Sequence, residues 1–323
     1  MQSHARREAQ SAPKNATQSQ ARQRRAIQSV SGKSHSRPCK ATQGAKHKAP
    51  PTKLKAPKSR REPEYNVPLL AIDVGNTHTV FGLWDGSTWL ATWRRTTNIQ
   101  TTEDELASWL SGLFLLKGIP WKINGAICAS VVPGINDSLS KLTQKHLDTK
   151  LQFLTTGADV GLTVTYDPPH AVGSDRIANA IAALARFEPP IIVVDLGTAT
   201  TFDTIDAKGD YVGGAILPGV QLSANALFQR AAKLPSVEFR PPATAIGRNT
   251  VSALQSGIML GYAGSIDRLA HEIQKELGCN AKVISTGGLG GLFLDLCDCI
   301  NSYEPSLTLD GLVLAYERLK SRV

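Results

Sequence analysis

Two segments of the sequence place an aspartate, a glycine and hydroxyl side chains directly after an apolar run. The first is Asp73-Val74-Gly75-Asn76-Thr77, and the second is Asp195-Leu196-Gly197-Thr198-Ala199-Thr200-Thr201. An aspartate at the end of a strand presents a carboxylate to a cation, glycine lets phosphate oxygens approach the backbone, and threonine supplies hydroxyl donors. Because 122 residues separate the two aspartates, the pattern predicts two similar lobes whose turns hold a nucleotide's phosphates from both sides of a cleft.

Two further segments would complete such a site. Residues 281–285 form an apolar run that leads into Thr286-Gly287-Gly288-Leu289, a loop open enough for a flat base or a ribose. Between the two turns lies Gly173-Ser174-Asp175-Arg176, at the start of a helical pattern. From residue types alone, two interpretations of this segment stay open. Asp175 stabilises the helix dipole while Arg176 makes a surface ion pair, or Asp175 removes a proton from a substrate hydroxyl while Arg176 binds a carboxylate or amide.

The elements that must position these residues follow from the hydrophobic pattern. In the first lobe we expect a hairpin at Asp85-Gly86 and a helix opened by the capping box Thr102-x-x-Glu105. The strands expected there cover residues 67–74, 79–84, 88–93, 125–132 and 151–155, with a second helix over 136–147. In the second lobe we expect strands over 191–194, 201–205, 211–216 and 281–285, and a long core and interface helix over 251–277.

The charge of the chain is divided unevenly. The chain holds 36 Lys and Arg against 27 Asp and Glu, a net charge of +9, but residues 1–66 hold 16 of the bases and only three of the acids. This basic tail contains almost no large aliphatic residues and is predicted to be disordered. It is interpreted as a solvated appendage, a transit peptide or an arm with weak affinity for nucleic acid, or the natural start lies near Val67. The remaining chain has a net charge of −4, which argues against nucleic-acid binding by the body.

Other bulk properties exclude further classes of protein. No window approaches 18 consecutive apolar residues, and the N-terminus lacks the apolar stretch of a secretory signal. The five cysteines form no CxxC pair and are expected to be reduced thiols. They are Cys39, Cys128, Cys279, Cys297 and Cys299. We therefore expect a cytoplasmic protein with no membrane partner.

Taken together and in order, these motifs resemble those of the type III pantothenate kinases, members of the acetate and sugar kinase, Hsp70 and actin superfamily. The resemblance spans residues 69–319. It rests also on Gly213-Gly214-Ala215-Ile216-Leu217-Pro218-Gly219, Leu227-Phe228-Gln229-Arg230-Ala231-Ala232-Lys233-Leu234-Pro235 and Gly247-Arg248-Asn249-Thr250. It implies an α/β fold of two ribonuclease H-like lobes, a duplicated actin-like ATPase fold with an interlobe cleft. We place the lobes at residues 67–188 and 189–323, after the disordered basic tail.

The resemblance also implies the roles of particular residues. Asp73 would position Mg²⁺, directly or through water, and Asp195 would bind a monovalent cation, K⁺ or NH₄⁺. The implied ATP contacts are Asp73, Val74, Gly75, Asn76, Thr77, His78, Thr79 and Thr198. The implied pantothenate contacts are Tyr166, Gly173, Ser174, Asp175, Arg176 and Thr250, with Asp175 as the catalytic proton acceptor. Because the family forms homodimers, Thr250 would act across the subunit interface.

The implied activity is ATP-dependent phosphorylation of pantothenate to 4′-phosphopantothenate, the first step of coenzyme A biosynthesis. Two alternatives stay open: a superfamily kinase with another acceptor, and a non-catalytic regulatory or nucleic-acid-binding relative that uses the basic tail. Two positions depart from the family pattern. Ser174 replaces the usual alanine, and its added hydroxyl is expected to fit. The residues after the tyrosine are usually Asn-Pro, whereas Asp167 and Pro168 follow Tyr166 here. The added acid is expected at most to weaken affinity for an anionic substrate.

Overall fold

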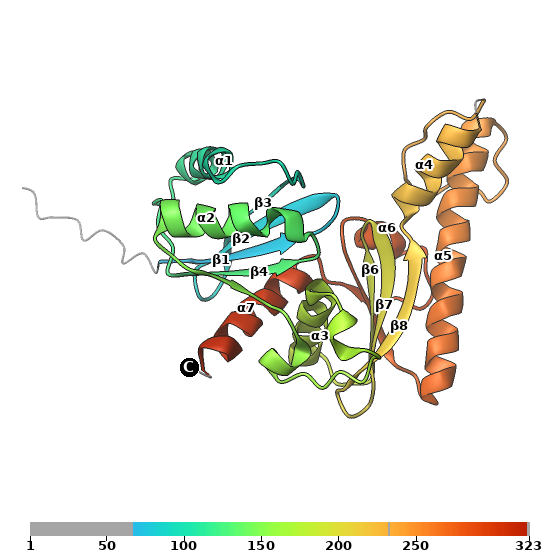
Figure 1. Cartoon of the computed structure of the whole chain (residues 1–323). Coiled ribbons are helices and arrows are strands. Elements are labelled where there is room, and N and C mark those ends of the chain that lie inside the picture. The colour runs from blue at the N-terminus through green and yellow to red at the C-terminus, as the bar shows by residue number, and fades with distance from the viewer. Residues whose placement is uncertain (1–66, 232, 322–323) are drawn as a thin grey trace, which may run out of the picture. The chain divides into compact units, whose positions relative to one another are not determined.

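Two five-stranded sheets with the same strand order confirm the duplication that the two aspartate turns predict (Figure 1). The computed structural model describes residues 67–231 and 233–321, so the predictions for the tail, residues 1–66, lie outside the described residues. In each sheet a central strand pairs with an antiparallel hairpin on one side and a parallel strand on the other. The two aspartates therefore occupy equivalent places near the ends of the two central strands.

The first sheet has the order β3-β2-β1-β4-β5, and α1 and α2 cover one of its faces (Figure 1). Its strands are β1 (Leu69–Val74), β2 (His78–Trp84), β3 (Trp89–Thr96), β4 (Gly125–Ser130) and β5 (Leu151–Phe153). The helices are α1 (Glu103–Leu116) and α2 (Asn136–Leu147). α1 begins as predicted, because the Thr102 hydroxyl accepts from the Glu105 N–H while the Glu105 carboxylate accepts from the Thr102 N–H. Phe81 and Phe114 belong to the apolar cluster between this sheet and its helices.

The second sheet has the order β10-β9-β6-β7-β8. Its strands are β6 (Ile191–Leu196), β7 (Ala199–Ile205), β8 (Tyr211–Pro218), β9 (Lys282–Thr286) and β10 (Ser302–Tyr303). α4 (Val220–Arg230) follows β8, while α5 (Thr250–Leu277) and the short α6 (Gly290–Phe293) pack against the sheet. With 28 residues, α5 is about 42 Å long, which is longer than the strands beside it. Its first turns therefore project beyond the sheet together with α4 (Figure 1).

Two helices lie on the faces of the sheets that point toward each other: α3 (Ser174–Arg186) and α7 (Leu307–Lys320) (Figure 1). The hydrophobic pattern did not predict α7, which packs against α3 and against β1 and β4. Gly311 of α7 touches the backbone of Ala178 in α3, where a Cβ would collide with the Ala178 carbonyl. The lobe boundary after residue 188 stays a prediction. In the described part of the chain, three 3₁₀ turns complete the connections: η1 (Pro133–Ile135), η2 (Gly157–Val160) and η3 (Pro169–Ala171).

Two of the bulk predictions concern membranes and cysteines. Among the helices of the described residues, none combines the length and apolar character needed to cross a membrane. The four cysteines in the described part of the chain are free thiols, with Cys128 and Cys297 buried and Cys279 exposed. Cys39 lies outside the described residues.

Candidate active site

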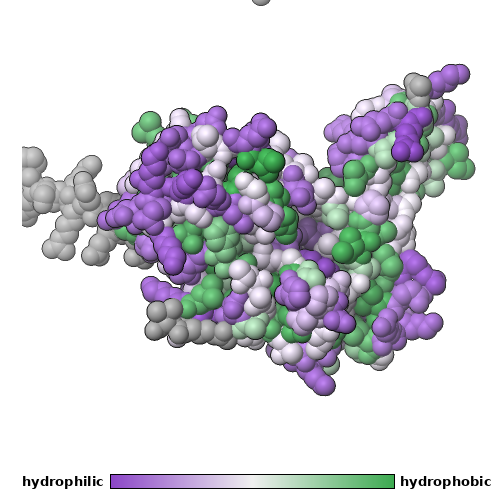
Figure 2. Space-filling view, viewed as in Figure 1, coloured by the Kyte–Doolittle hydropathy of each residue, from purple (hydrophilic) through white to green (hydrophobic). Residues whose placement is uncertain are grey.

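The two aspartate turns meet between the two sheets. Each turn is closed by its glycine, since the N–H groups of Gly75 and Gly197 donate to carbonyls two or three residues farther on, over 3.0 Å in both turns. The hydroxyls of Thr77 and Thr198 lie 2.8 Å apart, so they join the turns by a direct hydrogen bond. The surface is hollowed between the two halves of the described chain (Figure 2). The structure therefore brings together two turns whose threonines are 121 residues apart in the sequence.

Three carboxylates, those of Asp73, Asp175 and Asp195, lie close enough to act on one another. Burial, followed by the charges of Asp175 and Asp195, raises the pKa of Asp73 to about 8. Burial, followed by Asp175 and Asp203, raises the pKa of Asp195 to about 7. Burial also raises the pKa of Asp175. Such an accumulation of acids is costly unless a cation or a proton is bound, and it is typical of functional sites.

The carboxylate of Asp195 is held by a buried amide. Asn179 Nδ2 donates to Asp195 Oδ2 over 3.1 Å, and Thr308 Oγ1 donates to Asn179 Oδ1 over 2.8 Å. Asn179 is fully buried on α3, and Thr308 lies in the first turn of α7. From the other side Gly287, with φ +83°, packs so closely on the backbone of Leu196 that a side chain would collide there. The C-terminal helix thus fixes the orientation of an aspartate in the cleft.

Asp175 lies in the first turn of α3, a helix whose N-terminus has no side-chain cap. Asp175 Oδ1 accepts a hydrogen bond from the Arg176 N–H over 2.8 Å. A Cβ at Gly173 would collide with this carboxylate, so glycine is required for its position. The added hydroxyl of Ser174 fits, because it is buried and accepts a hydrogen bond from the Ser130 N–H over 3.0 Å. This bond ties the start of α3 to the end of β4.

Arg176 forms a buried ion pair rather than one at the surface. Its Nε donates to Asp203 Oδ1 over 2.6 Å, and the Tyr211 hydroxyl donates to the same oxygen over 2.8 Å. The Asp203 side chain is fully buried and that of Arg176 is 11 % exposed. The guanidinium lies 5.7 Å from the centre of the Tyr211 ring. Tyr166 lies beside the same cluster, because its ring would contact a Cβ at Gly213 at 3.5 Å.

The implied ATP contacts of the first turn divide into two groups. Three are exposed in the turn, where the Thr77 hydroxyl bonds to that of Thr198: Asn76, Thr77 and His78. The side chain of Val74 is instead part of the core, so only its backbone borders the turn. Thr79 is buried, and its hydroxyl lies 2.9 Å from that of Thr97, which donates to Gly75 O over 2.7 Å. Thr79 thus supports the turn from behind.

Thr250 lies apart from these residues. It is exposed at the first position of α5, which Asn249 caps by accepting a hydrogen bond from the Ser252 N–H over 2.9 Å. Within the described chain, Thr250 makes no hydrogen bond to residues 173–176 or to Tyr166. Its helix end projects with α4 (Figure 1).

The second turn also carries the start of α4. The Gly219 N–H donates to Thr198 O over 3.1 Å, and α4 begins at the next residue without a side-chain cap. The free N–H groups and the dipole of a helix N-terminus attract anions. Because α4 begins at the turn, its free N–H groups lie at the turn.

Four residues of this region were not predicted: Asn179, Asp203, Tyr211 and Thr308. A signal existed for two of them. Asn179 follows Asp175 by four residues, so both lie on one helix face. Asp203 is an acid within the strand-like run 201–205, where a charge needs a partner. No local pattern indicated Thr308, because its helix was not anticipated.

The site offers carboxylate and hydroxyl oxygens as possible metal ligands, but the described side chains do not form a complete coordination site. Among the described residues, no three His, Cys, Asp or Glu side chains are arranged to hold a metal ion by themselves. Mg²⁺ is usually bound through one or two carboxylates together with water and substrate phosphates, so the arrangement fits an ion that arrives with a nucleotide. The raised pKa values of Asp73 and Asp195 support this fit, because a cation would relieve the repulsion between their carboxylates.

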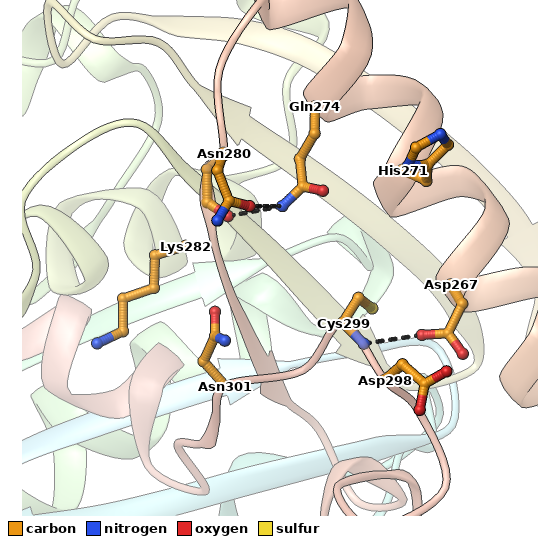
Figure 3. A pocket seen from close by; sticks show the side chains of 9 residues that line it. Asp267, His271, Gln274, Asn280, Lys282, Asp298, Cys299 and Asn301 are labelled. Carbon is orange, nitrogen blue, oxygen red and sulfur yellow. Dashed lines mark hydrogen bonds between the residues drawn. The ribbon is translucent and has the colours of Figure 1, made fainter.

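A pocket of about 720 Å³ lies elsewhere on the second lobe (Figure 3). It is bordered by the second half of α5, the start of β9 and the segment before β10, where the Cys299 N–H donates to Asp267 over 3.0 Å. Lys282 lines it at the beginning of β9, whereas Thr286, the partner of Asp195 in the sheet, ends that strand. The pocket and the aspartate turns therefore lie at opposite ends of the sheet.

The paired sheets, the two facing aspartate turns and the glycine turn beside them define the class of protein. The chain has an actin-like ATPase fold. A Baf family protein from Campylobacter jejuni shares the fold in its crystal structure, with a TM-score of 0.51 over 78 % of this chain and 98 % of that chain. The two sequences are only 20 % identical, so this likeness supports the fold alone.

Sequence comparisons narrow the class to one family. The model of the type III pantothenate kinase family matches residues 69–272. The type III pantothenate kinase of Myxococcus xanthus is 43 % identical over 251 residues, which is 77 % of this chain and 98 % of the relative. That of Desulfatibacillum aliphaticivorans is 46 % identical over 255 residues, 78 % of this chain and 99 % of the relative. The chain belongs to the type III pantothenate kinase family.

Proposed function

We propose that this protein transfers the γ-phosphoryl group of ATP to the primary hydroxyl of pantothenate, giving 4′-phosphopantothenate and opening coenzyme A synthesis. The observation that carries the proposal is the meeting of the two phosphate turns, joined by the Thr77–Thr198 hydrogen bond, beside the carboxylate of Asp175. The family to which the chain belongs supports the choice of acceptor. We expect the reaction to take place in the cytoplasm.

Asp175 is the proposed proton acceptor. It lies in the first turn of α3, and the hydrogen bond from the Arg176 N–H fixes its carboxylate. Burial raises its pKa, which makes the carboxylate a better acceptor for the proton of the substrate hydroxyl. Because phosphoryl transfer depends mainly on positioning and charge stabilisation, the base takes this proton as the new P–O bond forms.

The two turns supply the positioning. Backbone N–H groups around Gly75 and Gly197, the hydroxyls of Thr77 and Thr198, and the start of α4 would hold the phosphate chain in line with the acceptor. Asp73 would hold Mg²⁺ together with the phosphates, and Asp195 would hold K⁺ or NH₄⁺. These ions neutralise phosphate charge when they are bound.

The acceptor side is proposed to lie around Tyr166 and Arg176. The Nε–H of Arg176 donates a hydrogen bond to Asp203, so recognition of the pantothenate carboxylate or amide falls to the Nη groups of that guanidinium. The buried pair also fixes the direction of the arginine side chain. Tyr166, beside Gly213, would form a wall of the same pocket.

We propose a homodimer formed through α4 and α5. Large apolar side chains are exposed on both helices: Leu222, Leu227, Val251 and Leu260. Hydrophobic surface also lies along the outer strand β8 and near the tip of the two helices (Figure 2). Gly257, Gly261 and Gly264 have open space around them, although glycine within a helix costs about 1 kcal/mol relative to alanine. Close approach of a second copy would account for these glycines and would carry Thr250 toward a neighbouring site, which sedimentation and cross-linking can test.

The direct test of the activity is ADP release with ATP, Mg²⁺ and pantothenate, in potassium and again in sodium. We expect pantothenate-dependent release that requires potassium. Asp175→Asn should lower kcat about 100- to 10,000-fold with little change in melting temperature. Asp137→Asn, at an exposed ion pair on α2, is the matched control and should leave kcat unchanged. Normal turnover by Asp175→Asn would refute its role as proton acceptor. ADP release that does not depend on pantothenate but does depend on another alcohol would show that the acceptor is different.

A further inference from the structure

Arg94 is an arginine of the first lobe whose side chain reaches the Gly287-Gly288 turn of the second lobe. It lies on β3, and a Cβ built at Gly288 would be 3.5 Å from its Nη1. Its charge also acts on Tyr303, lowering that hydroxyl's pKa against the larger effect of burial. Tyr303 in turn donates to Gly287 O over 3.2 Å. Arg94 therefore lies beside the Gly287-Gly288 turn, close enough for a side chain at Gly288 to touch it.

The sheet register explains why this side chain points into the cleft. Asp73 pairs with Val80 across β1 and β2, and Val80 pairs with Arg94 across β2 and β3. Residues directly opposite one another in neighbouring strands project from the same face of a sheet. Arg94 therefore extends from the same face of the sheet as the carboxylate of Asp73.

The charge of Arg94 is available for a ligand. Its side chain is exposed, and among the described residues it has no hydrogen bond or ion pair. Arg176, the other arginine beside the cleft, already pairs with Asp203. An unpaired guanidinium on the same sheet face as Asp73 and beside the Gly287-Gly288 turn cannot be explained as a structural ion pair. It is suited to the oxygens of a phosphate group, which it can bind through two parallel N–H donors.

We propose that Arg94 binds the phosphate chain of ATP while the nucleotide rests on the Gly287-Gly288 turn, so that the nucleotide links the two lobes through this arginine. The inference rests on the proposed function in that the nucleotide is ATP. It adds a contact from β3, an element that carries none of the expected ATP residues. Phosphate, rather than the base, is the group recognised.

The neighbouring residue provides a matched control. Arg95 lies on the same strand but on its other face, where its Nη2 donates to Thr101 over 3.2 Å and its guanidinium lies 5.3 Å from the Trp109 ring centre. Arg95→Gln therefore removes an equal charge at the next position without touching the cleft. Any general effect of a lost arginine will appear in both variants.

The experiment is calorimetric titration of the full-length protein with ADP and with adenosine, together with the steady-state KM for ATP and for pantothenate. Arg94→Gln should weaken ADP binding and raise the KM for ATP about 10- to 100-fold, since a charged hydrogen bond to phosphate is lost. Adenosine binding and the KM for pantothenate should not change, and Arg94→Lys should restore part of the ADP affinity. Arg95→Gln should bind ADP as the unchanged protein does.

Four results would overturn the proposal, the first three of which concern Arg94→Gln and the unchanged protein. These three are an unchanged ADP affinity in Arg94→Gln, an equal loss of adenosine affinity, and an absence of ADP binding by the unchanged protein. A loss of ADP affinity shared by Arg95→Gln would count against it in the same way. ADP binding is measured without an acceptor, so it tests Arg94 separately from the proposed activity. If Arg94 is needed for ADP binding but the protein does not phosphorylate pantothenate, only the proposed acceptor is refuted.

Discussion

Replacing Asp195 by asparagine should stabilise the protein while it removes activity. Burial, then Asp175 and Asp203, raises the pKa of Asp195 to about 7 from 3.8. The unfolded chain therefore loses this proton near pH 4, whereas the folded chain keeps it until pH 7. As the pH rises between these values the folded state is progressively disfavoured. Asparagine has no charge to bury, and its side-chain oxygen can still accept the hydrogen bond from Asn179.

The magnitude follows from the size of the shift. A shift of about three pKa units at about 1.4 kcal/mol each sets an upper limit of about 4 kcal/mol above pH 7. Asp195 is only partly buried, so solvent screening reduces the expected gain to about 1–3 kcal/mol. For a domain of this size that raises the melting temperature by roughly 2–10 °C. The gain should shrink at pH 5, where the folded protein still holds the proton.

The assay is thermal unfolding of both proteins at pH 5 and pH 8, in tetramethylammonium buffer with a chelator and without nucleotide. Asp85→Asn is the control of opposite sign. Hydrogen bonds from the N–H groups of Thr88 and Ser87 lower the pKa of Asp85 to about 2, so its charge stabilises the fold at both pH values. That variant should be destabilised equally at pH 5 and pH 8.

Kinetics complete the test. Asp195→Asn should lose potassium-dependent turnover, because the proposed ligand of the monovalent cation has lost its charge. An Asp195→Asn variant that is no more stable than the unchanged protein at pH 8, or whose advantage does not grow from pH 5 to pH 8, would refute the repulsion on which the cation site is argued. Full activity with unchanged potassium dependence would separately refute the cation role.

Two further predictions concern α7. Gly311→Ala should destabilise the protein by about 1–3 kcal/mol in chemical unfolding, because its Cβ would push α7 away from the Ala178 carbonyl; an unchanged midpoint would contradict the close packing. Asn179→Ala should cost about 1–3 kcal/mol and raise the potassium concentration needed for half-maximal rate, because Asp195 and Thr308 lose their shared buried partner. Unaltered potassium activation in that variant would show that Asn179 does not position Asp195.

Much of the fold was predictable from local patterns. The boundaries of α2 and the capping box of α1 matched, because side-chain caps and apolar periodicity act within a few residues of the chain. The hairpin at Asp85-Gly86 also formed, with Gly86 at φ +103°. The repeated turn at Asp73 and Asp195 predicted the duplication, since the two segments share an aspartate, a glycine and hydroxyl residues at the end of a strand.

Other features depended on contacts that no local pattern indicates. α7 was missed, and with it the Thr308–Asn179 contact, which joins residues 129 positions apart. Arg176 was open to two interpretations, and only the packing of α3 against β7 placed Asp203 within reach of its Nε. A buried charge needs a partner of opposite charge, and the tertiary structure decides which residue lies close enough. The sequence around the arginine does not identify that residue.

The sequence by itself determined which chemistry the chain can carry: two aspartate turns, a glycine turn and an aspartate at a helix start, each encoded in a short segment. The tertiary structure decided how these segments meet. It joined Thr77 to Thr198, paired Arg176 with Asp203 and directed Arg94 rather than Arg95 toward the second lobe. The physical reason is that strand register and helix packing set which faces oppose each other, and these depend on the whole core.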